Sequence, residues 1–263
     1  MPLTLYLLRH GESVANVERI FAARKIDPPL SDLGIQQATM QAKSLRKLSS
    51  SSQFEFKALY ASPLRRAKHT AEIVGEWCGL EPIFSEDLME VDVGVLDGES
   101  QEDDVKWEMY ERVIKKWEQG LHHISFQGGE SLNDIEFRFG RFLKVLENKR
   151  TKPAAGRSEA VREDWGFLPS LARSHILVVG HCLLFMAVIW LFCRKPKLRE
   201  TKQTRPEYQT YCENHTSMLE DWHMGRGHLS IISKDNDKFR LIKFNLSPEE
   251  TSTQNILSKN VRR

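Results

Sequence analysis

The stretch ILVVGHCLLFMAVIWLFC, residues 176–193, decides the fold class of this chain. By length and apolar character it could pass for a membrane span, but Gly180 and His181 interrupt it. The β-rich run 176–179 predicts a buried strand, and the longer run 182–193 predicts a core helix. We therefore interpret the stretch as a strand followed at once by a helix.

Two further short apolar runs, residues 3–8 and 58–61, predict strands of the same buried kind. Patterns with apolar residues three and four apart lie between the predicted strands and indicate amphipathic helices. Residues 229–233 and 239–244 predict a terminal hairpin. The alternation of strands and helices predicts an α/β fold with three layers, α-β-α, around a mostly parallel sheet.

Three helix starts are predicted from capping patterns. Ser62 followed by proline is expected to open the helix after the second strand. Ser100 is expected to cap the next helix, and Ser131 with Asp134 the one after it.

The composition is that of an ordinary globular protein, with 40% hydrophobic and 28% charged residues and a formal net charge of +2. This balance favours neither nucleic acid nor a membrane as a partner. The cysteines are far apart and form no CxxC pair, which argues against a zinc or redox site and fits a reducing compartment. The first residues lack the features of a secretory signal. We therefore expect a cytoplasmic protein, and no feature demands a homodimer.

The predicted strands end at residues that could bind an anion. Ligands of such sheets bind at the carboxyl ends of the strands. The first strand ends at Arg9 and His10, the second just before Arg65 and Arg66, and the third at His181. We expect these side chains to converge on one edge of the sheet.

This residue set suits phosphoryl transfer. A neutral histidine such as His10 can act as a covalent nucleophile, and a phosphoryl group needs fixed donors around its oxygens. Arg9, Arg66 and a protonated His181 could supply them, with Asn16 as a neutral donor. Glu90, in a loop after a further predicted strand, could protonate the leaving group and then activate water.

Each residue also has a structural explanation when taken alone. A histidine at a strand end is more often structural, Arg65 or Arg66 could be a solvated helix residue, and Glu90 a surface acid. The argument for catalysis therefore depends on their occurrence together.

Several segments resemble the histidine phosphatase, or phosphoglycerate-mutase-like, superfamily, in the order found in that family. They are LLRHGESVAN (7–16), PPLSDLGIQQA (28–38), YASPLRRAKHTA (60–71), LMEVDVGVLDG (88–98), GGESLND (128–134), VVGH (178–181) and, more weakly, ENHTSM (213–218). A single Arg-His-Gly triplet would be weak evidence for this family, but six blocks in the family's order are a specific match.

The resemblance implies a six-stranded sheet and phosphohistidine catalysis without metal or other cofactor. It implies the catalytic residues His10, Glu90, Arg9, Arg66 and His181, with Arg66 rather than Arg65 as the phosphate ligand. Substrate binding is implied for Asn16, Arg9, Arg66, His181 and Asn214. The chain would then be a phosphoric monoester hydrolase of the histidine acid phosphatase-like branch 1.

Two positions depart from the family pattern. In the cofactor-dependent mutases an arginine follows the proton-donor glutamate and grips the substrate carboxylate, whereas here Val91 follows Glu90. This favours the phosphatase branches. Related phosphatases often carry glycine where this chain has Arg24, whose side chain could enter the substrate mouth or, as we slightly prefer, point to solvent.

The sequence therefore predicts a phosphatase acting on a small phosphorylated metabolite, with a sugar phosphate as one option. The alternatives are phosphoglycerate mutase-type phosphotransfer, a phosphoprotein phosphatase and, less favoured, a non-catalytic binding module. The domain is expected to span residues 1–246, with insertions or loops at 149–174 and 194–216. A disordered tail is expected at 247–263.

Overall fold

A six-stranded sheet forms the centre of the computed structural model, which describes residues 3–51, 54–148, 175–193, 217–221, 223–235 and 238–252. The strand order is β3-β2-β4-β1-β5-β6. The strands are β1 (Leu3–Arg9), β2 (Phe56–Ala61), β3 (Pro82–Phe84), β4 (His175–Gly180), β5 (Leu229–Asp235) and β6 (Lys238–Leu246).

The sheet is mostly parallel, as the sequence predicts. Strands β3, β2, β4 and β1 pair in parallel, whereas β5 is antiparallel to both β1 and β6. The antiparallel edge is the predicted terminal hairpin.

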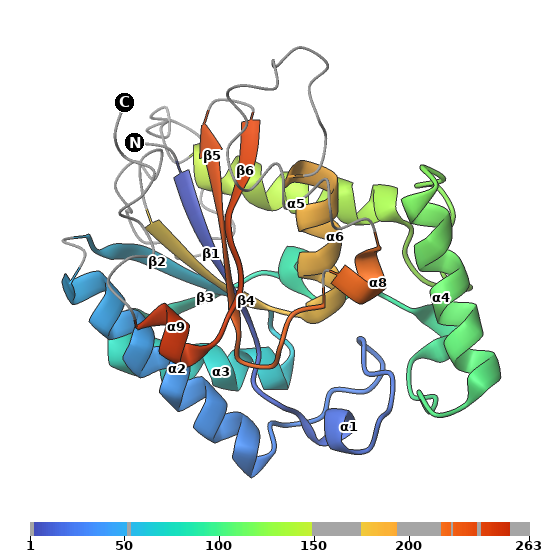
Figure 1. The fold of residues 1–263 in the computed structure, drawn as a ribbon, viewed down its shortest axis with the longest axis horizontal. Coiled ribbons are helices and arrows are strands. Elements are labelled where there is room, and N and C mark those ends of the chain that lie inside the picture. Colours follow the sequence, from blue (N-terminus) through green and yellow to red (C-terminus); the bar gives the residue numbers. More distant parts are fainter. Residues whose placement is uncertain are drawn as a thin grey trace, which may run out of the picture.

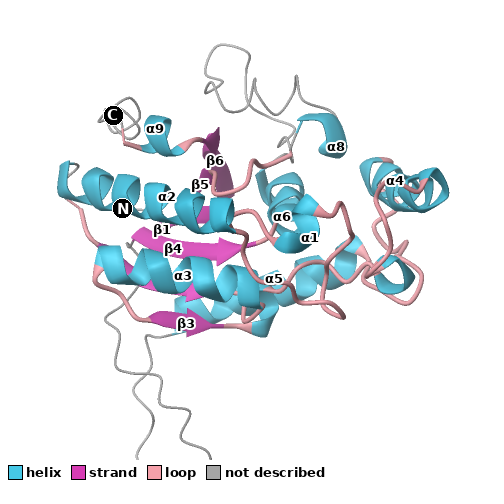
Figure 2. Cartoon of the chain, turned by 90° about the horizontal axis from the view of Figure 1, so that it is seen from below, coloured by secondary structure: helices cyan, strands magenta, loops and turns pink. Residues whose placement is uncertain are grey.

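Helices cover both faces of the sheet (Figures 1 and 2). Helices α2 (Asp32–Ser51) and α3 (Arg65–Cys78) pack on the face that receives Tyr6 and Leu8 of β1. Helices α5 (Leu132–Asn148) and α6 (Cys182–Cys193) pack on the face that receives Leu5 and Leu7. Successive side chains of a strand point to opposite faces, so β1 serves both cores.

The stretch 176–193 forms strand β4 and helix α6, as predicted. Almost every side chain of α6 is buried, which explains why the helix is apolar on all sides. In the described part of the chain, no helix is both long and apolar enough to cross a membrane.

Two of the predicted helix starts are wrong. Helix α3 begins at Arg65 rather than after Ser62, and its first amide is capped by the carboxylate of Asp27, at 2.9 and 3.0 Å. Helix α4 (Asp104–Glu118) is capped by Asp103 rather than Ser100. A tertiary cap and a nearer aspartate outweigh the local serine signals in these two cases. The pair Ser131 and Asp134 caps α5 as predicted.

The expected disordered tail is wrong for residues 247–252. Ser247 and Glu250 form a capping box that opens helix α9 (Pro248–Thr251). Thr251 is buried, and its hydroxyl accepts a hydrogen bond of 2.9 Å from Gln41 of α2. Residues 253–263, both expected insertions and Asn214 lie outside the described residues.

Candidate active site

The ends of two parallel strands bring the two histidines together. Arg9 at the end of β1 lies opposite Gly180 at the end of β4, and the amide of His10 donates to the carbonyl of Gly180 at 3.0 Å. The imidazole rings of His10 and His181, the next residues along the two strands, are 5.2 Å apart, at 63°. The predicted convergence of these side chains is confirmed for the histidines.

His10 is held in one orientation. Its Nδ1 lies 2.6 Å from the carbonyl oxygen of Gly11, so Nδ1 carries the hydrogen and Nε2 presents its lone pair. That lone pair accepts a hydrogen bond of 3.3 Å from Nε of Arg66. Burial, followed by the charges of Arg66 and Arg9, lowers the pKa of His10 well below its usual value. The ring is therefore neutral near pH 7, as a nucleophile must be.

The two arginines are buried beside it. Nη2 of Arg66 donates to the carbonyl oxygens of Ala22 and Ala23, at 3.0 and 3.3 Å, and Nη1 lies 3.5 Å from Asp27. Arg9 donates through Nη1 to the carbonyl of Met224. Within the described residues its buried Nε has no partner, which leaves a donor for an anion. Arg65 is exposed, so Arg66 is the arginine that faces His10.

His181 is fully buried behind His10. Its Nε2 lies 2.8 Å from the hydroxyl of Ser62, and within the described chain its Nδ1 has no partner. Burial, then the charges of Arg66 and of His10, lower the pKa of His181 well below its usual value. The structure thus favours the neutral ring, whereas the sequence analysis expected a protonated His181, because desolvation and neighbouring cations both oppose a positive charge there.

Asn16 lies on the short helix α1 (Val14–Val17), which places it in the same pocket as His10. Its Oδ1 accepts from the amide of Ser13 at 3.1 Å, and the hydroxyl of Ser13 accepts from the amide of Asn16 at 3.4 Å. Because Oδ1 is engaged in this capping box, Nδ2 remains as the neutral donor predicted for Asn16.

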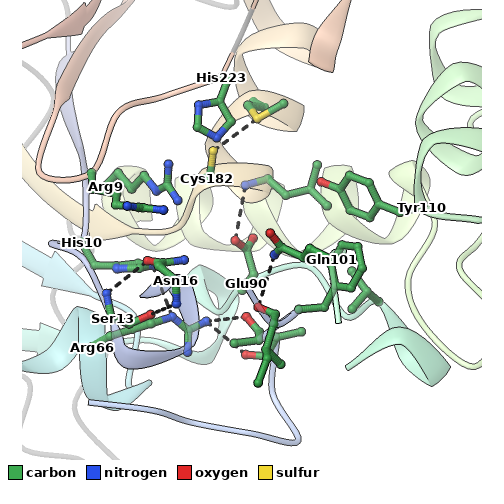
Figure 3. A pocket seen from close by; sticks show the side chains of 18 of the residues that line it. Arg9, His10, Ser13, Asn16, Arg66, Glu90, Gln101, Tyr110, Cys182 and His223 are labelled. Carbon is green, nitrogen blue, oxygen red and sulfur yellow. Dashed lines mark hydrogen bonds between the residues drawn. The ribbon is translucent and has the colours of Figure 1, made fainter. Parts of the chain in front are cut away.

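The carboxylate of Glu90 is anchored on the first turn of α6. Its Oε1 accepts from the amides of Val91 and Leu184, at 2.9 and 3.0 Å. Its Oε2 has a longer contact of 3.4 Å with the amide of Leu183. A helix N-terminus stabilises a carboxylate in this way, and it holds Glu90 at the wall of the pocket (Figure 3).

Arg24 points neither into the substrate mouth nor to solvent, so the preference for solvent is wrong. Its Nε donates to the carbonyl oxygen of Glu90 at 3.0 Å, and its Nη2 lies 2.8 Å from Glu130. Glu130 is shared with Arg138, at 2.9 Å. No sequence signal identified this network, because its members come from three distant segments.

The pocket has two chemically different sides and about 990 Å³ of space, part of it open to solvent. Arg9, His10, Asn16 and Arg66 form the polar side. Apolar side chains also line the pocket, and Tyr110 among them lies across it from His10 in Figure 3. We call this group the apolar side: Phe21, Val93, Trp107, Tyr110, Met186 and Leu219. Figure 3 shows Glu90 and Gln101 between the polar side and Tyr110. The sequence did not reveal the apolar side, because its members come from separate helices and loops and nothing along the chain distinguishes them from core residues.

A mostly parallel α/β sheet with a neutral, oriented histidine, two buried arginines and a carboxylate at one pocket defines a protein of the phosphoryl-handling class. The chain belongs to the histidine phosphatase superfamily (branch 1), whose family profile matches residues 5–155.

Relatives within this family include both phosphatases and mutases. Over 145 residues the chain is 32% identical to phosphoserine phosphatase 1 of Hydrogenobacter thermophilus. That alignment covers 55% of this chain and 64% of that protein. Over 186 residues the chain is 35% identical to a 2,3-bisphosphoglycerate-dependent phosphoglycerate mutase of Allorhizobium ampelinum. That alignment covers 67% of this chain and 84% of that protein.

The fold is shared with a solved mycobacterial glucosyl-3-phosphoglycerate phosphatase, with a TM-score of 0.64 and 21% identity. The superposition covers 94% of this chain and 100% of the mycobacterial protein. At this identity the likeness concerns the fold alone.

Proposed function

We propose that this chain hydrolyses the phosphomonoester of a small metabolite through a phosphohistidine formed on His10, without a metal ion. The observation that carries the proposal is the orientation of His10. The Nδ1 contact with Gly11 leaves the Nε2 lone pair facing Arg66, at 3.3 Å, in the pocket that also contains Glu90.

In the first step, Nε2 of His10 attacks the phosphorus atom while the bond to the ester oxygen breaks. Arg66 and the unpartnered Nε of Arg9 are placed to receive the phosphoryl oxygens as their charge develops. The leaving oxygen takes a proton from Glu90. In the second step, water gives a proton to Glu90 and attacks the phosphorus, which releases phosphate and restores His10.

The two oxygens of Glu90 differ in the number of contacts they make. Oε1 already accepts two main-chain hydrogen bonds, whereas Oε2 has one long contact. We assign the proton to Oε2, because a hydrogen on Oε1 would compete with its two donors.

Hydrolysis is favoured over mutase activity by the position of Val91. Its side chain is fully buried in the hydrophobic core and cannot contact a substrate carboxylate. A mutase must keep its bisphosphate intermediate bound while the intermediate reorients, and the side chain of Val91 cannot bind the carboxylate of that intermediate.

The proposal is tested by phosphate release from a panel of phosphorylated metabolites in the presence of EDTA. We expect turnover by wild type and by the control His122→Ala, whose side chain lies outside the pocket, and none by His10→Ala. When the substrate carries a labelled phosphoryl group and the reaction is quenched without acid, which would hydrolyse phosphohistidine, the label should remain covalently bound to wild type and not to His10→Ala. Activity that needs added metal, or that survives His10→Ala in a folded protein, would contradict the proposal.

The role of Glu90 is tested by the leaving group. Glu90→Gln should slow hydrolysis of alkyl phosphates about 10²- to 10⁴-fold, and that of p-nitrophenyl phosphate much less, because nitrophenolate leaves without a proton. Equal losses on both substrates would remove Glu90 from the general-acid role.

A further inference from the structure

The apolar side of the pocket is built around three aromatic rings in mutual contact. Phe21 stacks on Trp107 with centroids 6.0 Å apart at 19°, and Tyr110 lies 5.2 Å from Phe21 and 5.5 Å from Trp107. The two rings of α4 thus form one surface with Phe21, from the loop after α1, and this surface lines the pocket opposite His10.

This surface offers few hydrogen-bonding groups. The indole Nε1 of Trp107 donates to Glu111 at 2.9 Å, outside the pocket lining, and Nε2 of Gln101 donates to the carbonyl of Ile20 at 3.2 Å. Among the described residues on this side, the Tyr110 hydroxyl and the Gln101 oxygen remain for a substrate. Burial raises the pKa of Tyr110 well above its usual value, so its hydroxyl stays neutral.

Two further basic side chains line the described part of the pocket, Arg226 and His223. Arg226 at the rim is paired with Glu12 at 2.6 Å. Partial burial, together with the charges of Arg9 and Arg226, lowers the pKa of His223 to about 4, so this ring is neutral near pH 7. Arg9 and Arg66 face His10 and are used by the phosphoryl group.

We propose that the site takes phosphate monoesters whose alcohol carries an aromatic or aliphatic group. The organic group packs on Trp107, Tyr110 and Phe21 while the phosphoryl group sits against His10. This inference rests on the proposed phosphatase function and narrows its substrate class.

A polyhydroxylated alcohol, such as a sugar, fits this surface less well. Aromatic rings can stack on the apolar face of a sugar, but each buried hydroxyl left without a partner weakens binding. Among the described residues of this aromatic surface, Tyr110 and Gln101 are the groups that could pair with such hydroxyls. An apolar alcohol has no such cost, and its binding is strengthened in proportion to the apolar area that it buries.

The test compares primary alkyl phosphates with similar leaving groups: ethyl, 2-phenylethyl, glycerol 1- and glucose 6-phosphate. We expect kcat/KM for 2-phenylethyl phosphate to exceed that for ethyl phosphate about 10- to 100-fold, and to exceed both polyol phosphates. Trp107→Ala should lower the ratio of kcat/KM for 2-phenylethyl phosphate to kcat/KM for ethyl phosphate about 10-fold. Trp77→Ala, on the far helix α3 and 36% exposed, is the matched control and should leave the ratio unchanged.

A ratio near one, or a preference for glucose 6-phosphate or glycerol 1-phosphate, would overturn the inference while the phosphatase function stands. Calorimetric binding of 2-phenylethylphosphonate and ethylphosphonate to wild type separates the other outcomes. If no phosphate ester is turned over but the phenylethyl compound binds at least about 10-fold more tightly, the substrate class stands and the phosphatase function fails. Equal binding of both phosphonates without turnover would overturn both proposals.

Discussion

Nε of Arg24 donates a hydrogen bond to the main-chain carbonyl of Glu90, over 3.0 Å. The same guanidinium is paired with Glu130, which also accepts the amide of Asp92 at 3.0 Å and is held by Arg138. The loop that carries Glu90 is therefore fixed at two main-chain positions by a largely buried ionic network. We therefore expect Arg24 to act as a positioning residue for the proposed proton donor.

Replacing Arg24 should release this loop. We expect Arg24→Ala to lower kcat/KM for alkyl phosphates about 10- to 100-fold, because misplacing a reacting group by about 1 Å has effects of this size. The loss should be smaller for p-nitrophenyl phosphate, whose leaving group needs no proton. Arg112→Ala, an exposed arginine of α4 paired with Glu108, is the control. An equal loss on both substrates would indicate a structural role alone.

Ser62 should matter for catalysis although it does not cap α3. Its hydroxyl contacts Nε2 of His181 at 2.8 Å and thereby fixes the imidazole next to His10. Losing one buried hydrogen bond costs about 1 kcal/mol, so Ser62→Ala should lower kcat/KM about 5-fold at unchanged secondary structure. Ser44→Ala is the matched control, because the Ser44 hydroxyl bonds within its own helix, to Met40 at 3.1 Å. A wild-type rate for Ser62→Ala would show that His181 needs no such support.

The same glycine-to-alanine change should have opposite effects in two helices. In α2, a Cβ on Gly34 would lie 2.0 Å from the carbonyl oxygen of Glu12, directly behind His10 and Gly11. Gly34→Ala should therefore lower the free energy of unfolding by about 3 kcal/mol. In α5, a Cβ on Gly140 meets nothing within 4 Å. Gly140→Ala should therefore raise the free energy of unfolding by about 0.5–1 kcal/mol. Urea denaturation measures both; a stabilised Gly34→Ala would contradict the close approach.

Stability should decrease on acidification because His10 and His181 are buried in the neutral form. Their folded pKa values lie well below the usual value near 6.5. Below about pH 6.5 the unfolded chain therefore binds more protons than the folded protein. The free energy of unfolding falls with pH in that range, by up to about 1.4 kcal/mol per pH unit for each histidine.

Urea denaturation of wild type and His181→Asn at about pH 7 and about pH 5.5 measures this effect. The variant should lose less stability on acidification than wild type, since one of the two contributions is removed. His122→Asn serves as the control. An identical loss in wild type and His181→Asn would show that His181 does not contribute.

The sequence by itself determined the sheet, the strand-helix division of residues 176–193 and the residues at the strand ends. These features depend on local apolar periodicity and on chain order, and both can be read along the chain. The ordered family blocks distinguished Arg66 from Arg65 and matched Glu90 to the family's proton donor, choices that strand ends and chemistry alone left open.

The tertiary structure alone decided how those residues are held and which charges they carry. The cap of α3 by Asp27, the anchoring of Glu90 on α6 and the support of Glu90 by Arg24 join segments far apart in the chain. The neutral state of His181 follows from its burial among cations. Desolvation and pairing depend on distances in space, so no pattern along the chain could have predicted them.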